Sequence, residues 1–358
     1  MSGAVLPADA RLLVVRMGAL GDIVHALPVL AAVRAARPDV AVDWLVDARY
    51  AAVLDLVEGV RTRVVVRAAA AGERAGERRF AGAAGLFGAI GWLRAQGYAA
   101  AVDLQGLIKS AVFARASAAT RVVGFVVDQL RERQAAWMYT ETVAGPEGGH
   151  VVLKNLAALP ALGLDVPPHP AFPWRDVPSS VAEMVAALPA VRASGGRFAV
   201  LNPGAAWPNK RWPAERFGAL AARLGQDLGV PSVVSWGGAE RALAESIVTA
   251  SAGQAVVSPP TALADLLAVF RRAALVVSGD TGPLHLAASV GAPVVGLFGP
   301  TRPERNGPWD PRDESVSRAA TCVCFHKRHC VRGRACVDDI TVDEVLAACR
   351  RRLDAGRG

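Results

Sequence analysis

The stretch LVVSGDTGPLHLAASVGAPVVGLFG, residues 275–299, decides the fold class of this chain. It opens with an apolar, β-branched run at 275–277 and passes through a polar turn at 278–283. An apolar helical run follows, and a second apolar strand pattern closes the stretch at 294–298. Because the order strand, tight turn, helix, strand defines a βαβ unit, this stretch predicts a parallel sheet covered by helices.

The turn within this stretch has the chemistry of an anion site. Thr281 is placed to cap the following helix, and Pro283 suits its first turn, where a missing N–H costs nothing. The first N–H groups of that helix and the positive end of its dipole favour a phosphate. The alternative is that Asp280 and Thr281 only cap a helix, and the S-G-D-T-G motif by itself leaves both interpretations open.

Working outward, the same pattern of strand, turn and helix fills both halves of the chain. A strand at 11–16, a turn at 17–22 and a helix at 23–37 open the first half. The proline cluster at 167–173 is stiff and cannot continue a helix, so it marks a boundary. We therefore predict a domain at 1–170, a second at 171–340 and a final helix at 341–358. The length of 358 residues agrees with about two domains.

Each half is expected to present polar turns at the carboxyl ends of its strands, where open α/β sheets bind ligands. In the first half these turns are 17–22 and 105–110, and in the second they are 202–211, 236–240 and 278–285. Two such halves predict a cleft between them, which is the usual place for a ligand.

Composition limits the class of protein. Hydrophobic residues make up 52% and charged residues 20%, which is typical of a globular chain. The first ten residues lack the basic and apolar pattern of an export signal, so we expect a cytoplasmic protein. The apolar run at 80–93 would reach only about 20 Å as a helix, too short to span a bilayer. It would form a core helix or lie on a membrane surface.

The net charge of +8 indicates an anionic partner, whether nucleic acid, phospholipid or a phosphorylated or carboxylated substrate. Nucleic acid is disfavoured, because no nucleic-acid-binding motif accompanies the charge and aromatic residues are only 6%. The turn at 17–22 does not follow the G-x-G-x-x-G fingerprint, so a nicotinamide cofactor is disfavoured as well.

Asp22 and the connector at 67–79 each have both a structural and a functional interpretation. Asp22 lies where a turn meets a helix, which suits a carboxylate with or without a chemical role. The arginine-rich connector at 67–79 is either a solvated loop or a clamp for phosphate and carboxylate groups, which match the guanidinium fork.

Four of the five cysteines crowd near the end of the chain, with two histidines between them. Zinc is one possibility, but the spacing C-x-C-x5-C-x5-C is not that of a standard finger, and reduced structural cysteines are the default. We predict no metal. The residues concerned are Cys322, Cys324, His326, His329, Cys330 and Cys336.

Four blocks in this order resemble glycosyltransferase family nine, inverting enzymes whose main members are the lipopolysaccharide heptosyltransferases. They are VVRMGALGDIVHALP at 14–28, DLQGLIKS at 103–110, NPGAAWPNKRWP at 202–213 and SGDTGPLHLA at 278–287. The resemblance covers nearly the whole chain. It implies two Rossmann-like, doubly wound parallel-sheet domains facing a cleft, the GT-B type, with the acceptor in the first domain and the sugar nucleotide in the second.

The resemblance also implies roles for single residues. Asp22 matches the proposed general base, and Lys210 and Asp280 match contacts to the sugar nucleotide, with Lys210 also close to the chemistry. The phosphate-binding turn corresponds to Thr281, Gly282 and His285, and Glu240 lies near a carboxylate that contacts the ribose. Basic and polar residues of the first domain are expected to hold the acceptor: Arg67, Arg78, Arg79, Gln105, Lys109 and Arg131.

The run DWLVD at 43–47 and the block at 103–110 are most similar to the heptosyltransferase I branch of the family. That branch implies transfer of heptose from ADP-L-glycero-D-manno-heptose to the Kdo region of lipid A, peripheral to the inner membrane. No Asp-x-Asp occurs, so we expect transfer without a metal or other cofactor. The alternatives are another sugar nucleotide or acceptor, an epimerase or hydrolase, and a non-catalytic binder of nucleotide sugars.

Overall fold

The computed structural model describes residues 5–70, 72–325 and 327–356, and the chain divides into two compact units, Met1–Asp176 and Val177–Gly358. The division falls beyond the proline cluster that the sequence indicated, because this segment is bonded to the first unit. The Glu58 amide donates to the Pro173 carbonyl over 2.8 Å, and the Arg175 amide donates to the Leu56 carbonyl over 2.8 Å. The roles predicted for the two domains stay predictions.

Unit 1 is built on an eight-stranded sheet with the order β4-β5-β3-β2-β1-β6-β7-β8. All neighbouring strands are parallel except β4 and β5, which are antiparallel. The strands are β1 (Arg11–Val15), β2 (Ala41–Asp47), β3 (Val60–Ala68), β4 (Gly72–Arg74), β5 (Glu77–Ala81), β6 (Ala100–Asp103), β7 (Arg121–Phe125) and β8 (Glu141–Val143).

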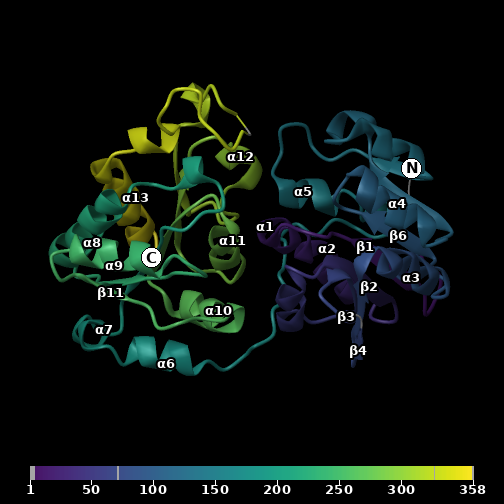
Figure 1. Cartoon of the computed structure of the whole chain (residues 1–358), viewed down its shortest axis with the longest axis horizontal. Coiled ribbons are helices and arrows are strands. Elements are labelled where there is room, and N and C mark those ends of the chain that lie inside the picture. Colours follow the sequence, from purple (N-terminus) through teal and green to yellow (C-terminus); the bar gives the residue numbers. More distant parts are fainter. Residues whose placement is uncertain (1–4, 71, 326, 357–358) are drawn as a thin grey trace. The chain divides into compact units, whose positions relative to one another are not determined.

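The helices of unit 1 cover both faces of its sheet. They are α1 (Leu20–Val24), α2 (Leu27–Ala36), α3 (Gly82–Arg94), α4 (Ile108–Ala116) and α5 (Val151–Leu156), with 3-10 turns η1 (Ala51–Leu56), η2 (Val127–Gln129), η3 (Arg133–Met138) and η4 (Pro160–Leu162). Helices α3 and α4 share one buried cluster with the sheet, through Leu93 and Phe113 among others. They therefore lie on the same face, and Figure 1 shows them as neighbours.

Three expectations for unit 1 need correction. The arginine-rich connector is not a loop, because most of it forms the end of β3 and the strands β4 and β5. Glu77 is buried in β5 and binds Arg79 over 2.8 Å, so the charge of this arginine is neutralised within the sheet. The helix expected at 23–37 is two helices, α1 and α2. The sequence also predicts one helix from His150 to about 162, but α5 ends at Leu156 and the chain resumes only as the turn η4.

Unit 2 has a fully parallel sheet of six strands with the order β11-β10-β9-β12-β13-β14. The strands are β9 (Ala199–Asn202), β10 (Ser232–Val234), β11 (Ala255–Val257), β12 (Leu275–Gly279), β13 (Val294–Phe298) and β14 (Glu314–Ser317). The βαβ unit predicted from 275–299 is confirmed as β12, α11 (Gly282–Ser289) and β13.

The other helices of unit 2 are α6 (Ser180–Ala186), α7 (Pro189–Ala193), α8 (Ala214–Leu228), α9 (Arg241–Thr249), α10 (Leu263–Arg272), α12 (Pro303–Asn306) and α13 (Val342–Asp354), with 3-10 turns η5 (Pro208–Lys210), η6 (Ala319–Thr321) and η7 (Cys336–Asp339). The sequence predicts a helix at 262–271 with Thr261 as its cap. The N-cap is Ala262 instead, and its amide donates to the Asp265 carboxylate over 2.9 Å.

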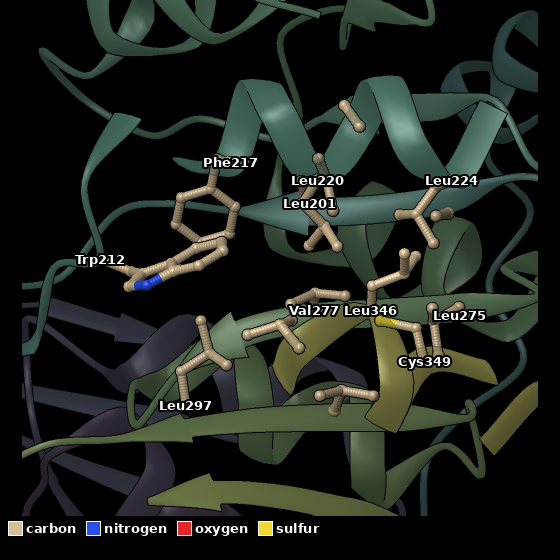
Figure 2. Close-up of a cluster of buried hydrophobic side chains, with 14 of the residues drawn as sticks. Leu201, Trp212, Phe217, Leu220, Leu224, Leu275, Val277, Leu297, Leu346 and Cys349 are labelled. Atoms are coloured by element: carbon tan, nitrogen blue, oxygen red, sulfur yellow. The ribbon is translucent and has the colours of Figure 1, made fainter. Parts of the chain in front are cut away.

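One buried cluster holds α8 and α13 against the sheet of unit 2. Figure 2 shows Phe217, Leu220 and Leu224 of α8 directed toward the strands, with Leu346 and Cys349 of α13 in the same cluster. Burial of a side chain of this size contributes about 1.5–3 kcal/mol, so the last helix is part of the core of this unit. Within the described residues, no helix combines the length and apolar character needed to cross a bilayer.

Candidate functional site

Asp280 is the centre of the polar site in unit 2. Its side chain is 2% exposed and follows β12, at the carboxyl end of the sheet. One carboxylate oxygen accepts from Lys210 Nζ and from Thr301 Oγ1, each over 2.6 Å, and the other lies 3.2 Å from His285 Nε2. Three segments that are far apart in sequence are therefore joined by one buried carboxylate.

The electrostatics of Asp280 follow from these donors. Burial by itself would raise the pKa of the carboxyl group, because it penalises the charged form. Hydrogen bonding and charge from His285, followed by Lys210, outweigh that effect and hold the pKa of Asp280 well below its usual range. The Asp280 carboxylate is therefore ionised at neutral pH and fixes the positions of its donors.

Lys210 is the cation of this site. Its ammonium donates to the Asp280 carboxylate and to the Asp280 carbonyl over 3.1 Å, and it lies 4.8 Å from the centre of the Trp207 ring. Because an ammonium has three donors, two bonds to Asp280 leave one N–H for a ligand. Gly279 is required here, since a Cβ at this position would lie 2.7 Å from the Lys210 carbonyl oxygen.

A second polar network ties the neighbouring strands together. Asn202, at the end of β9, donates to Ser278 Oγ over 3.0 Å and accepts from Ser235 Oγ over 3.2 Å. Its amide also lies 3.5 Å from Thr281 Oγ1. Ends of β9, β10 and β12 are thus held in register by hydrogen bonds as well as by the sheet.

Helix α11 begins beside this network. Among its first-turn residues, Pro283 has no N–H, and the Leu284 amide donates to the Thr281 carbonyl over 3.1 Å. Thr281 occupies the N-cap position, but its hydroxyl donates to the Gly279 carbonyl over 3.3 Å and caps no helix amide. The expected side-chain cap is wrong, and an anion at this helix start would meet the Gly282 amide and the positive end of the helix dipole.

Glu240 lies at the start of α9, as the sequence indicated. Its carboxylate is 4.0 Å from Arg211, and a Cβ at Gly204 would approach it within 2.2 Å. The glycine in N-P-G-A-A therefore makes room for this carboxylate beside the turn that carries Lys210. Such a position suits a hydroxyl ligand, because a carboxylate accepts hydrogen bonds from it.

The cysteine-rich segment, residues 322–336, packs on the Lys210 turn. Asn209 donates to the Lys327 carbonyl over 2.7 Å, and the Arg328 guanidinium lies 5.7 Å from the centre of the Trp207 ring. Trp207 therefore has a cation from each segment near its ring. The segment is part of the surroundings of Lys210 and not a separate appendage.

All five cysteines are free thiols. Cys324 Sγ and Cys330 Sγ lie 3.3 Å apart, and burial, with a hydrogen bond from the Cys336 thiol to Cys322, raises the pKa of Cys336 to about 12. Among the residues that the structure describes, no group of three or more His, Cys, Asp and Glu side chains is arranged to hold a metal ion. His326 lies outside the described residues, and the absence of a metal stays a prediction.

In unit 1, Asp22 follows β1 on the first turn of α1. One carboxylate oxygen lies 2.7 Å from the guanidinium of Arg16, and the other accepts from the Ala19 amide over 3.1 Å. The side chain is 40% exposed, so a hydroxyl group can reach it. Arg16 is itself buried and bonded to the Leu104 carbonyl, which fixes the direction of its guanidinium.

Gln105 and its neighbours form a rigid turn after β6. Gln105 Oε1 accepts from the Met17 amide over 2.7 Å, which ties this turn to the one that carries Asp22. The fully buried Asp103 carboxylate accepts from the amides of Gln105 and Gly106 and from the hydroxyls of Ser110 and Tyr139. Burial raises the pKa of Asp103 despite these four donors.

Three cations gather at the ends of β2, β3 and β6. Arg49 and Arg67 both bind the buried Asp47 carboxylate. Burial, followed by repulsion from Arg67 and Arg49, lowers the pKa of Lys109, and the negative charge of Glu132 opposes this effect. Because Asp47 and Glu132 together do not neutralise three cations, this cluster is an attractive place for an anion.

The remaining predicted acceptor residues are distributed differently. Arg78 and Arg79 lie inside β5 and not at its carboxyl end, and Arg79 is paired with Glu77. Arg131 is exposed in the segment between η2 and η3. The structure therefore gathers Arg67, Gln105 and Lys109 at strand ends and leaves Arg78 and Arg79 in the body of the sheet.

Sequence reasoning missed several residues of these sites. Asp47 is the last residue of its strand, and the others come shortly after the end of one. The same rule found the predicted residues, and applying it to every strand would have included these as well. They are Arg16, Asp47, Arg49, Ser235 and Thr301.

Comparison with known families and proteins gives consistent results. The family described as Glycosyltransferase family 9 (heptosyltransferase) matches residues 90–335. Lipopolysaccharide heptosyltransferase 1 of Pseudomonas aeruginosa is 29% identical over 330 residues, which cover 89% of this chain and 87% of that protein.

Solved structures share the fold. The structure of E. coli heptosyltransferase WaaC with ADP has a TM-score of 0.69 at 22% identity, covering 96% of this chain and 98% of that one. A glycosyl transferase family 9 protein from Veillonella parvula has a TM-score of 0.77 at 19% identity, covering 99% and 100%. A further WaaC structure, with ADP-2-deoxy-2-fluoro heptose, has a TM-score of 0.70 at 23% identity, covering 95% and 99%. The expected fold class, two doubly wound parallel-sheet domains of the GT-B type, is confirmed.

Proposed function

Because the chain belongs to glycosyltransferase family 9, the heptosyltransferases, we propose that it transfers heptose from ADP-L-glycero-D-manno-heptose to the Kdo region of the lipopolysaccharide inner core. The observation that carries this proposal is the Lys210 ammonium, held by the Asp280 carboxylate beside the first turn of α11. A diphosphate is stabilised by a cation and by the positive end of a helix, as both occur here. The ADP and ADP-heptose analogue named for the WaaC structures support this choice of donor.

The acceptor proposal has its own support. Kdo is an acidic sugar, and the cluster of Arg49, Arg67 and Lys109 offers cations to a carboxylate or phosphate. Arg131 and Gln105 extend the proposed acceptor set, with Arg78 and Arg79 as its more remote members. The similarity to lipopolysaccharide heptosyltransferase 1 of Pseudomonas aeruginosa favours the first heptose over a later one. A lipid-linked acceptor places the enzyme at the inner face of the cytoplasmic membrane.

The proposed reaction is a single displacement with inversion. Asp22 takes the proton of the acceptor hydroxyl while its oxygen forms a bond to the anomeric carbon. The bond from that carbon to the diphosphate oxygen breaks, and ADP leaves with the electron pair. Lys210, the α11 amides around Thr281 and Gly282, and His285 offset the charge that develops on the diphosphate. Glu240 accepts hydrogen bonds from the ribose hydroxyls.

The test of the catalytic proposal is Asp22→Asn. This variant is expected to fold and bind ADP normally but to lose turnover by about 10²–10⁴-fold, the usual contribution of a general base. Asp165→Asn, an exposed aspartate of the same unit, is the control and should retain full turnover. Near-normal turnover of Asp22→Asn would remove this residue from the mechanism.

The donor is tested by thermal shift with ADP, UDP and GDP sugars, since a ligand of the native state raises the unfolding midpoint. We expect the largest shift with the ADP sugar. A larger shift with UDP or GDP sugars would assign a different donor. A shift without product in an acceptor assay would indicate a non-catalytic binder.

Metal-independent transfer is a separate part of the proposal, supported by the lack of an Asp-x-Asp motif. Turnover measured with and without EDTA should be the same within error. Loss of turnover with EDTA, restored by added Mg²⁺ or Zn²⁺, would contradict it.

A further inference from the structure

The outer face of α3 is apolar along almost its whole length. The helix buries Ala89 and Leu93 against the sheet and leaves Phe87 77% exposed. Its other exposed positions are alanines and glycines, with a single charge at Arg94 near the end. A helix on the surface of a globular protein normally carries polar residues on its outer face. An exposed apolar face of this kind indicates an interaction site.

The elements next to α3 also expose apolar side chains. Helix α4 contacts α3 and presents Ile108, Val112 and Arg115 to solvent along one stripe. The turn η3 packs on α4 and carries Trp137, which is 83% exposed. We call this set the α3–α4 face: Phe87, Arg94, Ile108, Val112, Arg115 and Trp137.

The exposed charges of the α3–α4 face are positive. Between Gly82 and Val127 the sequence has four basic residues and a single acidic one, Asp103, which is fully buried. Two acidic residues follow at its edge: Asp128 in η2 binds Arg133, and Glu132, just before η3, accepts from the Ile108 amide. An exposed apolar surface whose own exposed charges are cations, with Asp128 at the edge paired to Arg133, is complementary to a surface that is both apolar and anionic.

We propose that the α3–α4 face docks on a bilayer that contains anionic phospholipid. Phe87, Val112 and Trp137 would enter the boundary between headgroups and acyl chains, where tryptophan is favoured because its ring is apolar and its N–H is polar. Arg94 and Arg115 would contact lipid phosphates, which attract basic residues near the surface. A helix of 13 residues is too short to span a bilayer but suits this interfacial position.

A second copy of the chain fits this face less well. In a twofold dimer the same patch would meet itself, and its cations would lie against cations. The proposal goes beyond the transferase activity. It rests on the proposed function only in that a lipid-linked acceptor explains why this enzyme would bind a membrane. The two can therefore fail separately: vesicle binding can be lost while transfer to a water-soluble acceptor persists, and transfer can be lost while vesicle binding persists.

The test uses the full-length protein and vesicles of phosphatidylcholine, with or without phosphatidylglycerol. The wild type should sediment with the anionic vesicles and much less with the neutral ones, and added salt should weaken binding. The double variant Phe87→Ser/Trp137→Ser should bind the anionic vesicles about tenfold or more weakly, because binding scales with the apolar area buried. Arg94→Gln/Arg115→Gln should lose the dependence on phosphatidylglycerol.

Met184→Ser is the matched control, since Met184 is an exposed apolar residue of α6 in unit 2. It should bind vesicles as the wild type does. Both double variants should keep their thermal midpoint and their turnover with a delipidated, water-soluble acceptor, which separates docking from folding and catalysis. Wild-type binding by both double variants would overturn the proposal. So would a concentration-dependent dimer without lipid that Phe87→Ser/Trp137→Ser abolishes.

Discussion

Asp280 shows how one residue organises a site. A buried carboxylate is costly unless donors compensate it, and here Lys210, Thr301 and His285 all bind it. These donors come from η5, from the segment after β13 and from α11. The same bonds that keep Asp280 ionised therefore also place the cation and the helix start that we assign to the diphosphate.

Asp280→Asn should destabilise the protein and weaken the donor site. The amide removes the negative charge but leaves Lys210 buried beside it, and breaking a buried ion pair typically costs about 3–5 kcal/mol. Urea unfolding measures the stability, and the thermal shift with ADP measures the site. Thr301→Val removes only one hydrogen bond to the same carboxylate and should cost about 1 kcal/mol. Equal stability of Asp280→Asn and wild type would contradict this account.

The pH dependence of stability follows from the lowered pKa of Asp280. Because the pKa of this group is lower in the folded than in the unfolded chain, the unfolded chain takes up its proton first on acidification. The stabilisation is complete above about pH 4, the ordinary pKa of aspartate, and falls below it. The difference in unfolding free energy between wild type and Asp280→Asn should therefore shrink as the pH is lowered from about 4. A constant difference down to pH 3 would show that the charge of Asp280 does not stabilise the fold.

At the scale of elements, the position of η5 depends on the close approach of β12. Gly279→Ala would place a Cβ 2.7 Å from the Lys210 carbonyl oxygen, and this atom belongs to the backbone and cannot turn aside. We expect η5 to shift, ADP binding to weaken, and stability to fall by about 1–3 kcal/mol, the usual cost of overpacking. Gly237→Ala, in the turn after β10, meets no atom within 4 Å and serves as the control. Calorimetric titration with ADP distinguishes the two variants.

Helix α13 gives a prediction that concerns stability only. Thr341 and Glu344 form a capping box, in which the Glu344 amide donates to Thr341 Oγ1 over 3.3 Å and the Thr341 amide donates to the Glu344 carboxylate over 2.8 Å. Thr341→Ala should lower the free energy of unfolding by about 1 kcal/mol. Turnover at a temperature well below the midpoint should not change. A loss of turnover there would mean that α13 affects the site as well as the core.

At the scale of the whole molecule, the chain has two separate cores, and the proposed donor site lies in unit 2. Since a ligand stabilises the unit that binds it, ADP at 100 times its dissociation constant should add about 2.7 kcal/mol to that unit. In calorimetric scans, ADP should raise the midpoint temperature of the unit 2 transition. It should not raise that midpoint in Lys210→Ala. An equal gain in Lys210→Ala would place the ADP site elsewhere.

Much of the fold followed from local patterns. The apolar runs predicted most of the inner strands, and the βαβ unit at 275–299 was confirmed as β12, α11 and β13. Strands β4, β5, β8 and β14 were missed, because each carries charged or polar residues that resemble a loop. Their strand conformation depends on pairing with a neighbour, such as β5 with β3, which a local pattern does not contain.

The sequence by itself determined the fold class, the family resemblance and the turns that carry polar residues, because strand, turn and helix signals lie within short stretches of chain. Only the tertiary structure decided which side chains share a site. Thr301 and Lys210 are distant along the chain, yet both bind one oxygen of Asp280, since parallel strands bring their carboxyl ends to one edge of the sheet. It also decided that Arg79 is paired with Glu77 while Lys109 lies near two further cations. Charge balance of this kind depends on distances in space, and spacing along the chain does not specify them.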